Sequence, residues 1–146
     1  MTVTLRIEGS DAYTPTPQDT PFLRVGGAEA VTALVEAFYD DMELNEPALA
    51  AVHHQEPPGK VSRGSRERFA MFLMGWLGGP QDYTEKHGHP RLRMRHAKVP
   101  VGVDLRDAWV RSMARAMDQR GLAGPVRSYL HTRFSEVADF LRNVQE

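Results

Sequence analysis

The sequence contains no cysteine, and this absence excludes several kinds of chemistry. Disulfide bonds, thiolate–metal sites, cysteine nucleophiles and thioether attachment of a cofactor all need that side chain. Apolar runs are also short. None approaches the about 18 residues that span a membrane, and the N-terminus lacks the charged-then-apolar layout of a secretory signal. We therefore expect a cytoplasmic protein that does not insert into a membrane.

An excess of positive charge is also missing. The chain has 18 Lys and Arg against 19 Asp and Glu, a formal net charge of −1, so nucleic acid is not expected as a main partner. Its 146 residues, 41% hydrophobic and 25% charged, have the composition of a single folded domain. We interpret residues 1–20 as an N-terminal extension that is flexible or lies over the body, and residues 21–146 as the domain.

Apolar residues recur at helical spacing through most of that domain. The stripes predict helices over residues 28–42, 62–77 and 104–120, and a last one from Gly124-Pro125 to about residue 143. A shorter helix is expected after Pro21, and residues 47–52 form a short apolar piece. Asp104 is the expected N-cap of the third long helix, and residues 81–88 are expected to form a loop. The sum predicts an all-α fold.

The stretch over residues 86–102, KHGHPRLRMRHAKVPVG, places one histidine on a short predicted helix bounded by two prolines. On that helix Leu92 and His96 share one face, while Arg91 and Arg95 point elsewhere. An imidazole on an apolar face, flanked by guanidinium groups, suits a buried planar anionic cofactor such as haem, and Leu92 would then contact it too. A partly buried histidine on a basic surface helix is the plainer alternative.

Other candidate residues are polar or aromatic groups beside the apolar stripes. Tyr39 lies at the edge of the first stripe, so its hydroxyl either reaches the interior or stays in water. The aromatic stripe around Phe69 is either plain core or the wall of a cofactor site. Trp109 is the one large donor-bearing side chain on the inner face of its helix. His53 and His54 are adjacent and point in different directions, so at most one faces inward.

Several short motifs occur in a fixed order: Gly26-Gly27, Phe38-Tyr39, GGP at 78–80, GHPRLRMRH at 88–96 and RDAW at 106–109. This order resembles the group II truncated haemoglobins over roughly residues 21–146. The resemblance implies a truncated globin-like, two-over-two helical sandwich around a non-covalent haem b, whose iron is bound by a proximal histidine. It places that ligand at His96.

The resemblance also implies roles for other side chains. Tyr39 and Trp109 match the family's distal tyrosine and tryptophan. His53 aligns with a position at a helix corner that holds Phe, Tyr or His, and Ser65 occupies the position where many globins carry a distal histidine. Phe69 and Phe72 are then expected to line the distal wall. The residues expected to contact the haem propionates are Arg68, Tyr83, Arg91 and Arg95.

Three classes of function stay open at this stage. The first is a haem protein that binds O2, NO or CO reversibly and releases O2 slowly, because Tyr39 and Trp109 hold the ligand by hydrogen bonds. The second is a redox enzyme, a nitric oxide dioxygenase or a peroxidase, which needs a separate reductase because the sequence has no flavin or nicotinamide domain. The third is a haem-free helical interaction module in which His96 is structural. A monomer or a homodimer is expected, and no catalytic residue is assigned.

Overall fold

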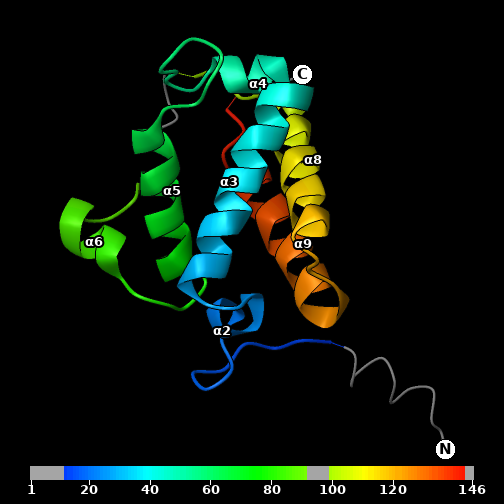
Figure 1. Ribbon diagram of the computed structural model, residues 1–146. Helices are drawn as coiled ribbons and strands as arrows, with labels where there is room; N and C mark the ends of the chain where they lie inside the picture. Colours follow the sequence, from blue (N-terminus) through cyan, green and yellow to red (C-terminus); the bar gives the residue numbers. More distant parts are fainter. Residues whose placement is uncertain (1–11, 92–98, 144–146) are drawn as a thin grey trace, which may run out of the picture.

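The computed structural model describes residues 12–91 and 99–143 (Figure 1). The described chain is helical apart from two isolated β-bridges, Thr16 with Asp19 and Gln55 with Val61. Its helices in chain order are α2 (Pro21–Val25), α3 (Ala28–Asn45), α4 (Pro47–Ala51), α5 (Arg63–Trp76), α6 (Asp82–His87), α8 (Val103–Gln119) and α9 (Gly124–Phe140). The predicted all-α fold is confirmed.

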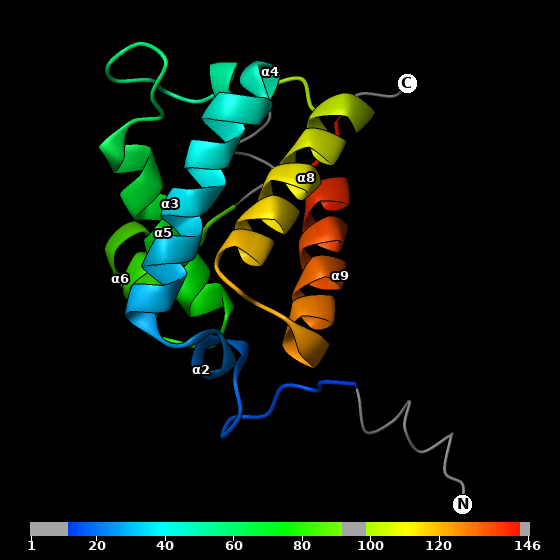
Figure 2. The ribbon, with the colours of Figure 1, turned by 45° about the vertical axis from the view of Figure 1, so that its right-hand side comes forward.

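The four long helices pack as two pairs. Helix α5 lies beside α3, α9 lies beside α8, and α3 also packs along α8 (Figure 1). Figure 2 shows the two pairs side by side, α3 with α5 and α8 with α9. This is the two-over-two arrangement that the resemblance to the group II truncated haemoglobins implies. None of the helices within the described ranges is long and apolar enough to cross a membrane.

The core lies where the apolar stripe of α3 meets the other helices. Phe38 and Met42 have no exposed surface, and Leu34 is 1% exposed. Met113 of α8 and Leu130 of α9 belong to the same buried cluster. The α3 residues recur at the spacing of one helix face, so the sequence pattern alone determines which side of α3 turns inward.

The ends of α5 follow from residues that favour helix termini. Ser62 is its N-cap and accepts a hydrogen bond from the Ser65 backbone N–H at 3.2 Å. After α5, Gly78 adopts a φ of 96°, which a residue with a side chain rarely adopts. A Cβ on the next glycine, Gly79, would lie 2.5 Å from the Phe22 ring. The glycine pair therefore both turns the chain and lets α2 approach the end of α5.

Three local predictions are wrong. Residues 81–88 contain α6 rather than only loop, and α6 has acidic residues in its first turn and basic ones in its last, which stabilise a short helix. Helix α8 has Gly102 as its N-cap with no side-chain cap, and Asp104 lies in the first turn. The predicted helix does not begin at Pro90, because Arg91 has a φ of 48°. The rest of that predicted helix, residues 92–98, lies outside the described residues.

Part of the N-terminal extension is described, and it lies over the body. Tyr13 is buried, and its ring meets the Tyr129 ring edge-on at 5.1 Å. The Tyr13 hydroxyl donates to the Asp19 carbonyl at 2.6 Å, and Arg24 lies over the same ring at 4.2 Å. Residues 12–20 are thus held by packing around one aromatic ring, while residues 1–11 lie outside the described chain.

Candidate ligand-binding pocket

A pocket of about 430 Å³ lies between the two helix pairs. Both pairs and the short helices α4 and α6 contribute to its wall, so it exists only when the layers are assembled. The described residues that line it are Tyr39, Leu49, Val52, His53, His54, Ser65, Arg68, Phe69, Phe72, Tyr83, Val99, Val101, Leu105, Arg106, Trp109, Val137, Ala138 and Leu141. Ten of these eighteen side chains are aliphatic or phenyl, and the other eight carry polar atoms.

One wall of the pocket is a group of contacting aromatic rings. The Phe69 ring lies 5.9 Å from that of Tyr39 and 6.4 Å from that of Trp109, in edge-on contacts. Phe38 lies behind them, 5.0 Å from Tyr39 and 5.1 Å from Trp109. Edge-to-face contacts of this kind hold rings in defined orientations. The stripe around Phe69 therefore belongs both to the core and to the pocket wall.

Tyr39 is inside the protein. Its side chain is buried in the core, and this burial raises the pKa of its hydroxyl. The hydroxyl therefore stays protonated at any ordinary pH. Of the two interpretations that the sequence left open, the structure favours the one in which Tyr39 reaches the interior.

The Trp109 indole N–H is the clearest hydrogen-bond donor at the pocket, because an indole nitrogen can only donate. Trp109 is partly buried and packs through ring contacts with Phe38, Phe69 and Phe134. None of the described residues accepts a hydrogen bond from its indole. A donor in this position suits an acceptor that enters the pocket from outside.

The two adjacent histidines have different surroundings. The Nδ1 atom of His53 lies 2.9 Å from the Leu49 carbonyl, and its ring meets the Tyr39 ring edge-on at 5.6 Å. Because a carbonyl only accepts, that nitrogen carries the proton, and in the neutral ring Nε2 then carries the lone pair. His54 is exposed and lies 3.8 Å from Glu56. His53 is thus the inner of the two, and its neutral form has an acceptor rather than a second donor.

The remaining polar residues of the wall differ in how far they are already paired. Ser65 accepts a hydrogen bond from the Ser62 hydroxyl at 3.0 Å. Arg106 is bound to Asp139 at 2.7 Å and to Asp107 at 3.0 Å. Arg68 is exposed and pairs with no carboxylate of the described chain. An unpaired cation beside an apolar cavity suits a ligand with an anionic edge.

The sequence-predicted site residues are largely brought together. Eight of them line the pocket: Tyr39, Trp109, His53, Ser65, Phe69, Phe72, Arg68 and Tyr83. Arg91 is exposed and is not among the described lining residues; its backbone N–H instead donates to His89 Nδ1 at 3.0 Å. Leu92, Arg95 and His96 lie outside the described residues. The roles of all these residues stay predictions.

The sequence prediction missed most of the aliphatic residues of the pocket wall. Leu105 of α8, Val137 of α9 and Leu141 at the C-cap of α9 contribute to it, together with Val99 and Val101 from the segment before α8. The helical residues were visible as members of apolar stripes. Nothing in a stripe, however, separates a residue that faces a neighbouring helix from one that faces a cavity. Only the assembled layers make that distinction.

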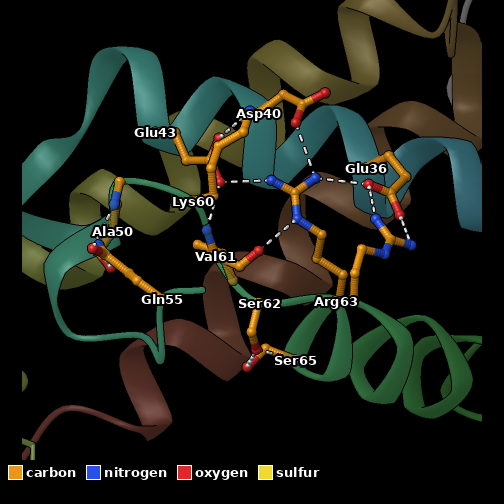
Figure 3. Close-up of polar contacts among 12 residues, drawn as sticks. Glu36, Asp40, Glu43, Ala50, Gln55, Lys60, Val61, Ser62, Arg63 and Ser65 are labelled. Atoms are coloured by element: carbon orange, nitrogen blue, oxygen red, sulfur yellow. Dashed lines mark hydrogen bonds and ion pairs between the residues drawn. The ribbon is translucent and has the colours of Figure 1, made fainter. Parts of the chain in front are cut away.

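An ion-pair cluster around the buried Arg66 lies beside the Tyr39 ring. Arg66 of α5 is 6% exposed and donates to the three carboxylates of Glu36, Asp40 and Glu43, at 2.7, 2.9 and 2.6 Å (Figure 3). Its Nε also donates to the Val61 carbonyl at 3.1 Å. We call these four charged residues the Arg66 cluster.

The cluster ties α3 to α5 and anchors the loop between α4 and α5. The three carboxylates stand at the spacing of one face of α3, which is why a single guanidinium can reach them all. Glu43 also accepts the Val61 backbone N–H at 2.6 Å, so both backbone groups of Val61 are bound to the cluster (Figure 3). The Arg66 guanidinium lies 5.6 Å from the centre of the Tyr39 ring. The cluster therefore positions a pocket residue without lining the pocket.

Comparisons with known proteins all find similarity to globins. A family model described as bacterial-like globin matches residues 20–143. The chain is 37% identical over 120 residues to the group 2 truncated hemoglobin YjbI of Bacillus subtilis, covering 82% of this chain and 86% of that one.

Solved structures agree with the sequence comparison. The group II truncated hemoglobin from Bacillus anthracis is similar with a TM-score of 0.78 and 30% identity, covering 87% of this chain and 98% of that one. A truncated oxygen-avid haemoglobin from Bacillus subtilis is similar with a TM-score of 0.74 and 34% identity, covering 85% and 99% of the two chains.

Proposed function

The chain belongs to the bacterial-like globin family, as a group II truncated haemoglobin, and we propose that it holds haem b by non-covalent contacts and binds O2 with slow release. The observation that carries the proposal is the Trp109 indole N–H, a donor with no described acceptor in a mostly apolar pocket. The B. subtilis relative described as oxygen-avid supports the choice of O2 among the diatomic ligands.

The described residues fit a haem. Apolar side chains from α5, α8 and α9 suit the faces of a porphyrin, and the unpaired Arg68 suits a propionate at its edge. Tyr83 packs edge-on against Phe72 at 5.7 Å, so its ring and hydroxyl also reach this part of the wall. His96 is proposed as the proximal ligand, with Leu92, Arg91 and Arg95 near it.

When bound, haem would supply an iron that can take a diatomic ligand. The rest of the proposal concerns what the side chains do. Trp109 donates a hydrogen bond to the ligand, and Tyr39 stays protonated and can donate as well. His53 in its neutral form carries the lone pair on Nε2, because Nδ1 donates to the Leu49 carbonyl, so Nε2 accepts hydrogen bonds rather than donating one to the ligand.

These hydrogen bonds are proposed to slow ligand release. A buried hydrogen bond stabilises by about 1 kcal/mol net, and each 1.4 kcal/mol that appears in the off-rate slows release about tenfold. A protein that releases O2 slowly delivers it poorly. Oxidation of nitric oxide by the bound O2 is therefore the second candidate function, and it requires a separate reductase to restore ferrous iron.

The proposal is tested by titrating the purified protein with hemin and recording its absorption spectrum. We expect a Soret band at one haem per chain and, after reduction, a five-coordinate ferrous spectrum. His96→Ala should lose that spectrum, whereas His89→Ala, which changes a nearby exposed histidine, should retain it. A protein that stays without a Soret band would contradict the proposal, and a normal ferrous spectrum in His96→Ala would contradict the proximal ligand.

A further inference from the structure

The aromatic contacts of the pocket wall continue out of the pocket. Trp109 lines the pocket, and its ring lies 5.6 Å from that of Phe134 on α9. Phe134 in turn is stacked on Trp76 of α5, with ring centres 5.2 Å apart and an interplanar angle of 19°. Neither Phe134 nor Trp76 is among the described residues that line the pocket. We call Trp109, Phe134 and Trp76 the aromatic ladder.

The two ends of the ladder lie in different surroundings. Phe134 in the middle is only 3% exposed, so water does not separate the rings. Trp76 is partly buried, and the guanidinium of Arg133, whose side chain is 44% exposed, lies 5.9 Å from the centre of its ring. The ladder thus joins the pocket to a tryptophan at the protein surface. Trp76 and Trp109 are the only two tryptophans of the chain.

Indole is among the most easily oxidised side chains, whereas a phenyl ring is much harder to oxidise. An electron can therefore pass from one indole of the ladder to the other through the phenyl ring between them. The oxidised residue is then one of the two tryptophans and not Phe134. Tyr39 is a poorer end point, because its oxidation releases the hydroxyl proton and its side chain is buried in the core, away from water that could take the proton.

We propose that the aromatic ladder carries oxidising equivalents from the haem pocket to a small phenolic reductant at Trp76. The oxidant is hydrogen peroxide reduced at the haem, so the proposal rests on the proposed function. Trp109 gives an electron to the oxidant in the haem pocket. Trp76 then gives an electron to Trp109 through Phe134. The Trp76 indole releases its N–H proton to water and becomes a neutral radical.

The electrons and protons of this sequence balance. Each hydrogen peroxide takes two electrons and two protons and becomes two waters. Each phenol gives Trp76 one electron and one proton and leaves as a phenoxyl radical, so two phenols are consumed per peroxide. The ladder serves a strong oxidant and not the reductive restoration of ferrous iron, because an indole gives up an electron only to a strong oxidant.

The test locates the radical in the haem-loaded protein. Hydrogen peroxide is added in the presence of a nitroso spin trap, and the adduct is found by mass spectrometry after digestion with trypsin. Cleavage after Arg68 and Lys86 places Trp76 in one peptide, and cleavage after Arg106 and Arg111 places Trp109 in another. We expect the adduct on Trp76 in the unmodified protein.

Two variants test the route. Phe134→Leu keeps an apolar side chain but removes the bridging ring, so the Trp76 adduct should be lost while the Trp109 adduct appears. Trp76→Phe should lose the surface adduct and also move the radical to Trp109, and it serves as the second test if Phe134→Leu does not fold. Phe140→Leu, which changes an exposed ring on the same helix, should leave the adduct on Trp76.

The outcomes separate this proposal from the proposed function. An absent Soret band means that haem is not bound, which is a failure of the proposed function seen before peroxide is added. A normal Soret band with no adduct on Trp76 overturns the ladder, and so does a Trp76 adduct that is unchanged in Phe134→Leu. A ladder that only stabilises the core would change the unfolding curve of these variants without moving the adduct.

Discussion

Two arginines stand two residues apart on α5, and their surroundings differ. The Arg66 side chain is 6% exposed and binds three carboxylates and a backbone carbonyl. Arg68 is exposed beside the pocket and pairs with no carboxylate of the described chain. A cation in the interior must be fully hydrogen-bonded, because leaving a buried charge unpaired costs several kcal/mol. A cation that stays unpaired must remain where water or a ligand can reach it.

The same contrast separates the ion pairs that lie outside the pocket from the polar side chains that line it. Outside the pocket, the Arg66 cluster holds α3 against α5, and Glu46 at the end of α3 binds Arg111 and Arg115 of α8. Within the pocket, Trp109 and Arg68 leave hydrogen-bonding capacity free among the described residues. Substitutions in the ion pairs should therefore change the free energy of unfolding. Substitutions of Trp109 and Arg68 should instead change how tightly the ligand or the haem is held.

Removing Arg66 should have the largest effect. Arg66→Met removes the closest cation from Glu43, whose side chain is only 10% exposed, so the free energy of unfolding should fall by about 3 kcal/mol, measured by urea unfolding of the haem-loaded protein. Arg63→Met is the matched control, because Arg63 is 64% exposed and pairs with Glu36 from the surface. Its loss should cost less than about 1 kcal/mol. Equal losses in the two variants would remove the distinction between a buried and a surface ion pair.

Neutralising Glu46 should cost about 2 kcal/mol at neutral pH, since charge-assisted hydrogen bonds contribute about 1.5–3 kcal/mol. Hydrogen bonds from Arg111 and Arg115 lower the pKa of Glu46 from 4.5 to about 2. Because the folded pKa lies below the unfolded one, this stability is present above pH 4.5 and is lost as the pH falls towards 2.

The acid unfolding of Glu46→Gln should therefore differ in shape from that of the unmodified protein. Between pH 4.5 and 2 the variant should lose less stability on acidification, and the two curves should converge. Glu67→Gln, at a side chain that is 68% exposed, should follow the unmodified protein throughout. Parallel curves for Glu46→Gln and the unmodified protein would show that Glu46 does not carry this pH dependence.

On the pocket side, Trp109→Phe should speed O2 release by on the order of tenfold, because it keeps a ring but removes the donor. The measurement is the O2 off-rate by stopped flow. Trp76→Phe makes the same change outside the pocket and should leave the off-rate unchanged. An off-rate that does not respond to Trp109→Phe would remove the indole from the proposed hydrogen bonds.

Arg68→Gln should have the smallest effect. A partly solvated contact with a propionate contributes less than about 1 kcal/mol, so haem loss should speed up by less than tenfold and the urea unfolding of the haem-free protein should not change. Haem transfer to an excess of a haem-binding acceptor protein measures this rate. If Arg68→Gln instead destabilised the haem-free protein as strongly as Arg66→Met, the comparison between the two arginines would be wrong.

Local prediction succeeded where neighbouring residues decide the structure. The spacing of Leu34, Phe38 and Met42 predicted both the helix and its buried face, and glycine pairs marked where α3 begins and α5 ends. It was wrong where two signals compete. Residues 81–88 look like a loop after a Gly-Gly-Pro turn, yet charges of the favourable sign at each end support a short helix there.

For the candidate site, the motifs named eight residues that the fold does bring to one pocket, but they could not show which of those residues are already paired. Arg66 was not singled out at all. Its sequence neighbours resemble those of Arg68, and its carboxylate partners lie 23 to 30 positions earlier in the chain. Residues at such separations meet only when α3 and α5 pack together.

The amino-acid sequence by itself determined the four long helices, their inward faces and the family to which the chain belongs, because periodicity and short motifs are local properties. Tertiary structure alone decided that Tyr39 is buried, that Arg66 is bound on all sides while Arg68 is not, and that two distant tryptophans are joined through one phenyl ring. The physical reason is that burial, charge pairing and ring contact depend on distances between helices.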